Sequence, residues 1–318
     1  MVGQALLEVF ASAVAPPLAI AAAGYLLGAL RDVDVEPLST VTIYLLLPPL
    51  VFHSLVTMTI DGDTALSLVA AMTVFTVGTA AVAAAVGRLA GETGSVLSGA
   101  TLAAAFPNVG NFGIPVATFA FGDVGRTTAV LFVLVQTILI YTVGVYLLAK
   151  SGESDRTAPI RRVLTLPVTY AMVAAGAALA FGLVPPAGGP TMRTIEMAGD
   201  ASIPMFLIIL GLQVAEMSPG RAIERVLPTV GVKLLVAPVA AAAVALAVGV
   251  ADAVAGRAFV VLASGPAAVT PLVLTIEFTD ESAGELSAAD YVGTVIVATI
   301  VGSLPVVSGL LVLSELGL

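Results

Sequence analysis

Two asparagines, Asn108 and Asn111, lie inside an apolar stretch that is long enough to span a bilayer. The residues expected to interrupt the helix around them are Pro107, Gly110, Gly113 and Pro115. Unpaired backbone groups cost several kcal/mol in lipid, so irregular chain is tolerated there only where protein covers it or where it lines a cavity. Residues 107–116 therefore predict a binding site that is rich in amide groups.

A second interruption is predicted in a later apolar stretch, at Ser264, Gly265, Pro266, Thr270 and Pro271. If both helices break at mid-depth and run in opposite directions, their loops cross near the centre of the bilayer. Two helix N-termini and two helix C-termini then meet at the crossing. Because N-termini favour anions and C-termini favour cations, the backbone alone does not select the ligand.

The side chains near the predicted crossing favour an organic anion. A proton or sodium exchanger of this architecture would need carboxylates at mid-membrane. The candidate acids fall near predicted helix ends instead: Glu8, Asp200, Glu277 and Asp290. The groups expected to line the crossing are neutral: Asn108, Asn111, Ser264 and Thr270. Amides, hydroxyls and backbone N–H groups suit an organic anion.

Lys233 is the basic residue that can lie deep, because it falls well inside the apolar stretch 224–250. In a buried position it would offset the charge of a substrate or neutralise the C-terminus of a broken helix. The alternative is that its side chain snorkels to the membrane surface. The sequence leaves both open.

The composition indicates an integral membrane protein, since 59% of the 318 residues are hydrophobic, 10% are charged and the mean hydropathy is +1.10. Ten apolar stretches have about the 20 residues that a spanning helix needs: 6–30, 38–57, 65–87, 96–121, 125–149, 162–184, 196–216, 224–250, 257–278 and 290–313. The net charge of −9 disfavours nucleic acid as a partner.

Chemistry beyond binding is not expected from this chain. The absence of cysteine excludes disulfides and thiolate metal sites, and a single histidine, His53, excludes a multi-histidine site. The sequence contains no Walker nucleotide-binding loop, and no Ser-His-Asp set or acid pair can be assembled at depth. We therefore expect neither an enzyme nor a cofactor.

The distribution of basic residues predicts how the chain is oriented in the membrane and where it divides into two halves. Placing both termini outside puts eight basic residues at cytoplasmic helix ends and leaves three outside. Residues 150–161 then form a cytoplasmic linker between a first five-helix repeat, 1–149, and a second, inverted repeat, 162–318. Pro49 and Pro204 are 155 residues apart, and Pro115 and Pro271 are 156 apart, although coincidence among 19 prolines is the alternative.

The sequence Pro-Asn-Val-Gly-Asn-Phe-Gly-Ile-Pro at 107–115 resembles the fourth-helix signature of the auxin efflux carrier family, in its bacterial and archaeal form. Gln136 and Tyr141 look like the fifth-helix glutamine and tyrosine of the plant PIN carriers. Two other segments are similar to the ninth-helix crossover and to the second-helix proline of the family: 266–271, followed by Glu277-Phe278, and 47–50. The resemblance adds Gln136 and Tyr141 to the candidate site.

This resemblance implies an all-α fold of ten membrane helices as two inverted repeats, related to bile-acid/sodium symporters and sodium/proton antiporters, with helices four and nine broken and crossed. Helices one, two, six and seven would form a dimerising scaffold. Helices three to five and eight to ten would form a mobile transport domain. Family members move weak organic acids such as auxin, malate or malonate. Asn111 stands where plant carriers usually have an apolar residue, which argues against auxin itself.

We therefore expect a secondary transporter of a small organic anion, a mono- or dicarboxylate, that works by elevator-type alternating access in the cell membrane. A homodimer formed through the scaffold is expected. Efflux is the simpler direction, because a negative cell interior drives anions outward. A sodium- or proton-coupled symporter or antiporter stays open, as does a membrane sensor that binds a ligand without moving it.

Overall fold

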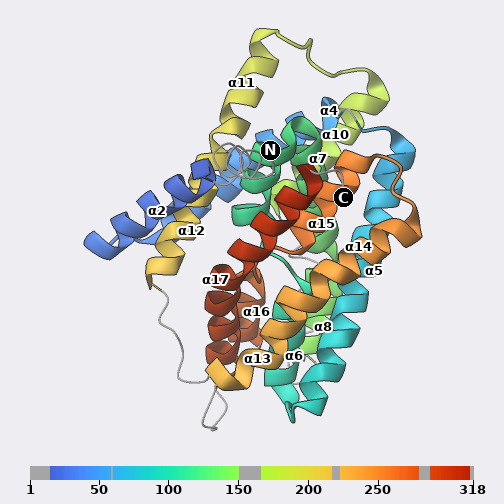
Figure 1. The fold of residues 1–318 in the computed structure, drawn as a ribbon. Coiled ribbons are helices and arrows are strands. Elements are labelled where there is room, and N and C mark those ends of the chain that lie inside the picture. The colour runs from blue at the N-terminus through green and yellow to red at the C-terminus, as the bar shows by residue number, and fades with distance from the viewer. Residues whose placement is uncertain (1–14, 59, 150–165, 217–222, 279–286, 316–318) are drawn as a thin grey trace.

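The computed structural model describes residues 15–58, 60–149, 166–216, 223–278 and 287–315, and this part of the chain is helical with no β-strand (Figure 1). The first elements are α2 (Ala15–Leu30), α3 (Val35–Val41), η2 (Thr42–Leu46), α4 (Leu47–Val56), α5 (Gly62–Leu89), α6 (Gly94–Ala105), η3 (Val109–Gly113), α7 (Ile114–Leu139), η4 (Ile140–Gly144) and α8 (Val145–Ala149). The later elements are α10 (Pro167–Phe181), α11 (Pro190–Asp200), α12 (Ser202–Glu216), α13 (Ile223–Gly231), η5 (Val232–Val236), α14 (Ala237–Val248), α15 (Ala253–Ala263), α16 (Thr270–Phe278) and α17 (Ala288–Glu315). The η segments are single π-helical turns.

Six helical segments are long and apolar enough to cross a membrane, judged by length and composition: Val35–Val56, Gly62–Leu89, Val109–Leu148, Pro190–Ala215, Ile223–Val248 and Ala288–Ser314. Four apolar helices are shorter: Ala15–Leu30, Gly94–Ala105, Pro167–Phe181 and Ala253–Ala263. The segment Val109–Leu148 joins parts of two predicted stretches, 96–121 and 125–149, and Gly122 interrupts it with φ 58° and ψ −140°. The coarse prediction of an all-α membrane protein is confirmed.

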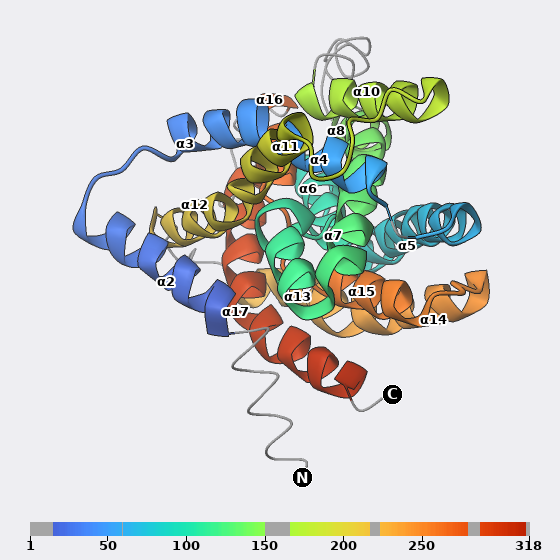
Figure 2. The ribbon, with the colours of Figure 1, turned by 90° about the horizontal axis from the view of Figure 1, so that it is seen from above.

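Small residues bring α2 and α12 into close contact, and Figures 1 and 2 show the two helices side by side. A Cβ atom added to Gly24 of α2 would collide with the backbone of Ile208, and one added to Gly211 of α12 would collide with the backbone of Ala21. Gly24 and Gly28 form a Gly-x-x-x-Gly pattern, which permits close backbone approach between membrane helices.

An aromatic cluster fixes the helices that carry the two chain interruptions. Phe75 of α5, Phe132 of α7 and Phe259 of α15 are fully or almost fully buried, with ring centroids 5.6–6.2 Å apart. Two of the three contacts are edge-to-face, the geometry that the ring quadrupoles favour. The cluster ties α15 to α7 and α5, so the ends of these helices have fixed positions.

Two acidic residues in loops cap the helices that follow them. The Asp61 carboxylate accepts hydrogen bonds from the backbone N–H of Thr64 at 2.9 Å and from its hydroxyl at 2.7 Å, and these bonds lower the pKa of Asp61. Asp252 accepts from the backbone N–H groups of Val254 and Ala255 at the start of α15. Caps of this kind satisfy N–H groups that the first helical turn leaves free.

Candidate substrate-binding site

The two predicted interruptions are present, and they meet. The chain between α6 and η3 runs extended past the chain between α15 and α16, with an isolated antiparallel bridge between Pro107 and Ala267. The backbone N–H of Asn108 donates to the Pro266 carbonyl at 2.8 Å, and the N–H of Ala268 donates to the Phe106 carbonyl at 2.9 Å. These two bonds satisfy backbone groups that the broken helices would otherwise leave unpaired.

Asn108 has a fixed side-chain orientation at this crossing. It precedes η3 as its N-terminal cap, and its side-chain oxygen Oδ1 accepts from the backbone N–H of Asn111 at 3.1 Å. Because only the amide oxygen can accept that bond, the amide nitrogen Nδ2 points the other way. Asn108 is 6% exposed, and Nδ2 has no hydrogen-bond partner among the described residues.

A cavity of about 400 Å³ lies against the crossing. Six of the predicted site residues line it: Asn108, Gly110, Asn111, Gln136, Tyr141 and Thr270. The polar lining residues that sequence reasoning missed are Ser39, Thr42, Thr137 and Gln213. Apolar side chains complete the walls, among them Phe106, Ile114, Ile140 and Phe206. The sequence feature that could have identified Gln213 is that it has the one amide side chain within the apolar stretch 196–216.

Three buried amide atoms of residues that line this cavity have no hydrogen-bond partner in the described structure. They are Nδ2 of Asn108, Nε2 of Gln136 and Oε1 of Gln213, which come from the crossing, α7 and α12 respectively. A buried polar atom without a hydrogen bond costs about 1–3 kcal/mol. Two of these three atoms are N–H donors, and the third is a carbonyl acceptor.

Helix N-termini at the cavity add to its preference for an anion. Gly110 and Asn111 at the start of η3, which continues into α7, line the cavity, and so does Thr270 at the start of α16. Each N-terminus presents unsatisfied N–H groups and about half a positive charge. No Asp, Glu, Lys, Arg or His is among the described lining residues, and the described chain has no group of three or more His, Asp and Glu that could hold a metal ion.

All four π-helical turns of the described chain belong to this region. Thr42 of η2, Asn111 of η3 and Tyr141 of η4 line the cavity, while η5 carries Lys233. π-Helical turns inside α-helices are rare and occur frequently at functional sites. The sequence contained no signal that distinguished these turns from ordinary helix.

Lys233 is buried with no exposed surface, so its side chain does not snorkel. Its ammonium nitrogen Nζ donates to the carbonyl of Ala263, the last residue of α15, at 3.3 Å. The carbonyl groups at a helix C-terminus stabilise a positive charge. Of the roles predicted for Lys233, the geometry fits neutralisation of a broken-helix C-terminus, and Lys233 does not line the cavity.

The remaining predicted site residues shape the crossing but do not line the cavity: Gly113, Pro115, Ser264, Gly265, Pro266 and Pro271. A Cβ on Gly113 would lie 2.8 Å from Leu262, and one on Gly265 would lie 3.2 Å from the Phe112 ring, so both glycines allow close packing. The Ser264 hydroxyl donates to the Val260 carbonyl at 2.7 Å. Ser264 was expected to line the crossing, but this bond turns it back onto its own helix.

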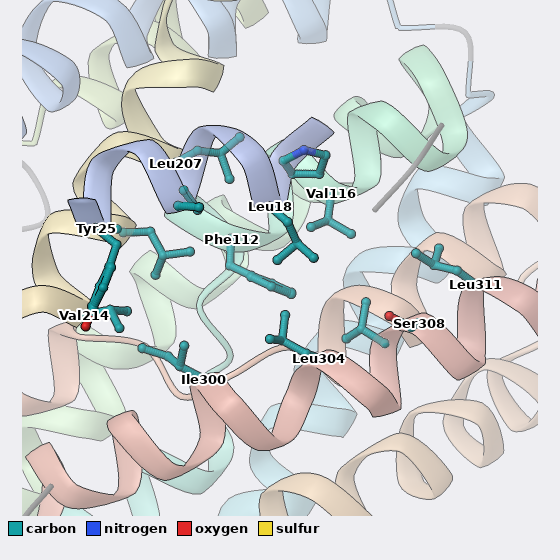
Figure 3. A pocket seen from close by; sticks show the side chains of 16 residues that line it. Leu18, Tyr25, Phe112, Val116, Leu207, Val214, Ile300, Leu304, Ser308 and Leu311 are labelled. Carbon is teal, nitrogen blue, oxygen red and sulfur yellow. The ribbon is translucent and has the colours of Figure 1, made fainter. Parts of the chain in front are cut away.

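A second pocket, of about 220 Å³, borders η3 through Phe112 (Figure 3). Its walls come from α2, α12, α17 and the η3–α7 segment, with Phe112, Leu304 and Leu18 among the labelled side chains. Tyr25 and Ser308 supply the polar side-chain atoms among its lining residues. None of the described residues that line this apolar pocket carries a charge that could compensate an ionised ligand.

Comparison with known proteins agrees with this geometry. The sequence profile of a family described as membrane transport protein matches residues 9–166. A protein of Methanothermobacter thermautotrophicus that is named an uncharacterized transporter is 28% identical over 263 residues, which cover 80% of this chain and 84% of that protein. With its long apolar helices, the protein is thus a multi-pass membrane transporter and not an enzyme. The chain belongs to the membrane transport protein family that includes the auxin efflux carriers.

Proposed function

We propose that the protein is a secondary transporter of a small organic anion, which binds in the cavity at the crossing. The observation that carries the proposal is the set of three unpaired, buried amide atoms from Asn108, Gln136 and Gln213 around one cavity. Two helix N-termini border the same cavity. A carboxylate would accept hydrogen bonds from the amide N–H groups and would lie in the positive potential of the helix ends.

Movement by an elevator mechanism is supported by the origin of the cavity walls. In the proposed ten-helix inverted repeat, Thr42, Phe206 and Gln213 belong to the scaffold of helices one, two, six and seven. Asn108 and Thr270 belong to the transport domain of helices three to five and eight to ten. A cavity between two units that slide past each other can be exposed on one side of the membrane and then on the other.

An ion pair crosses the same proposed boundary. Arg126 of α7 donates to Asp200 of α11 at 2.8 Å and to its neighbour Asp123 at 3.1 Å. In the proposed orientation these residues lie toward the outside, whereas Ser39 and Gln213 of the cavity lie toward the cytoplasm. The arrangement fits a carrier that is closed outside and accessible from inside, with both termini outside and the protein in the cell membrane.

Counterflow in proteoliposomes tests the proposal. Vesicles loaded with unlabelled carboxylate should accumulate labelled carboxylate transiently, and vesicles without protein should not. Repeating the assay with imposed sodium and pH gradients separates a uniporter from a sodium- or proton-coupled carrier. Because the described lining has no carboxylate side chain that could hold a cation, we expect neither gradient to be required. Binding without counterflow would contradict transport and support a sensor.

The expected homodimer is checked by the mass of the purified protein in detergent.

A further inference from the structure

The charges around the crossing limit the charge of the ligand, a point that rests on the proposed function. The described lining of the cavity is uncharged, so fixed charge there comes from helix ends and from Lys233. The N-termini of η3–α7 and α16 each contribute about half a positive charge, and the C-termini of α6 and α15 each contribute about half a negative charge. These four contributions cancel to a first approximation.

The net charge at the crossing then depends on Lys233. Its ammonium group is fully buried against the α15 C-terminus, and no carboxylate of the described chain forms an ion pair with it. Two described acids at the ends of neighbouring helices have other partners: Glu92 pairs with Arg225, and Asp252 caps α15. The crossing therefore carries at most about one net positive charge before a ligand binds.

We infer that the site takes a monocarboxylate and discriminates against dicarboxylates. One ionised carboxylate matches the positive charge at the crossing, and Asn108 and Gln136, which line the cavity, each have an unpaired amide N–H group that can donate to it. A second carboxylate would bring an uncompensated charge against the apolar walls of the cavity, which is costly. The rest of the substrate contacts Phe106, Ile114 and Phe206, so its body is apolar.

Three acids of matched chain length test the inference: hexanoate, adipate and the monomethyl ester of adipate. The ester has one charge but keeps polar oxygens at its far end, so it separates charge from polarity. Binding to purified protein is measured by isothermal titration and thermal shift, with benzoate and phthalate as an aromatic pair. We expect hexanoate, the ester and benzoate to bind at least about tenfold more tightly than their dianionic counterparts.

The possible outcomes separate the monocarboxylate inference from the transport proposal. Equal or tighter binding of adipate and phthalate would overturn the monocarboxylate inference and leave the transport proposal intact. Binding of the monocarboxylates without counterflow would overturn the transport proposal and not the charge rule. No binding by any of the five would contradict both. Lys233→Gln should weaken hexanoate binding at least about tenfold, whereas Lys233→Arg should retain the order of affinities. If Lys233→Gln does not fold, the wild-type series alone gives the answer.

Discussion

Two hollows border one π-helical turn, η3, and they differ in chemistry more than in size. Asn111 faces the cavity of about 400 Å³, and the next residue, Phe112, faces the apolar pocket of about 220 Å³. The cavity has three buried amide atoms without partners, while the described walls of the pocket are almost entirely hydrocarbon. In a bilayer an apolar hollow needs no dedicated ligand, because lipid chains are as apolar as its walls. We therefore base the proposed binding site on unpaired polar atoms and not on volume.

The largest effect is expected from Asn108→Asp. A carboxylate oxygen can still accept the Asn111 N–H and hold the turn. The variant loses the unpaired N–H donor and adds a negative charge beside the substrate. We expect counterflow of the folded protein to fall by at least about 100-fold, together with a loss of thermal stability because the new carboxylate is buried. Phe112→Leu, in the wall of the apolar pocket, is the matched control and should retain most of the activity. Equal losses in both variants would contradict the distinction between the two hollows.

Replacing the other two amides should raise stability in both cases and weaken substrate binding only where an N–H donor is lost. Gln136→Leu and Gln213→Leu each remove a buried polar atom that has no partner in the described structure. We expect both variants to be more stable by about 1 kcal/mol. Only Gln136→Leu, which removes an N–H donor, should bind the substrate carboxylate about tenfold more weakly, because the unpaired atom of Gln213 is a carbonyl acceptor. Titration and thermal unfolding measure the two effects. A loss of stability in both variants would indicate that the amides support the fold and do not serve the ligand.

A substitution in the wall of the apolar pocket, Gly211→Ala, should affect substrate binding less than Gln136→Leu does, but it should clearly lower stability. A Cβ at position 211 would collide with the backbone of Ala21 and Tyr25 in α2. Gly211→Ala should therefore lower stability by about 1–3 kcal/mol, since neither backbone can move away without separating α2 from α12. The folded fraction should keep its substrate affinity within about twofold. Gly176→Ala, where an added Cβ meets no atom within 4 Å, is the control. A large loss of affinity in folded Gly211→Ala protein would link the pocket to the site.

The smallest effect is expected from Ser308→Ala, which removes a hydroxyl from the apolar pocket. Uptake should change by less than about twofold, and stability by less than about 0.5 kcal/mol. A strong transport defect in this variant would show that the pocket contributes to substrate binding.

Local sequence rules predicted the interruptions, because prolines and glycines disfavour continuous helix wherever the fold places them. The helices end at Ala105 and Ala263, as residues 107–116 and 264–271 indicated. The depth of Lys233 also followed from its distance to the ends of its apolar stretch, but burial against Ala263 could not be distinguished from snorkelling without the packing of η5.

Features that depend on contacts between distant segments could not be predicted. The register in which Asn108 pairs with Pro266 is set by the packing of whole helices. Gln213 reaches the cavity only because α12 lies beside η3, and Ser264 satisfies its hydroxyl within its own helix. The proposed ten-helix inverted repeat, the domains 1–149 and 162–318 and the scaffold division stay predictions. Glu8 and the linker 150–161 lie outside the described residues.

Substrate protection of single cysteines compares the two hollows in one experiment, because the natural chain has no cysteine and each variant carries one thiol. Thr137→Cys places the thiol in the amide-lined cavity, and Ser308→Cys places it in the apolar pocket. The rate of maleimide labelling is measured with and without a saturating monocarboxylate such as hexanoate. Our account predicts that the substrate slows labelling at position 137 and leaves the rate at position 308 unchanged. Protection at 308 with none at 137 would contradict it.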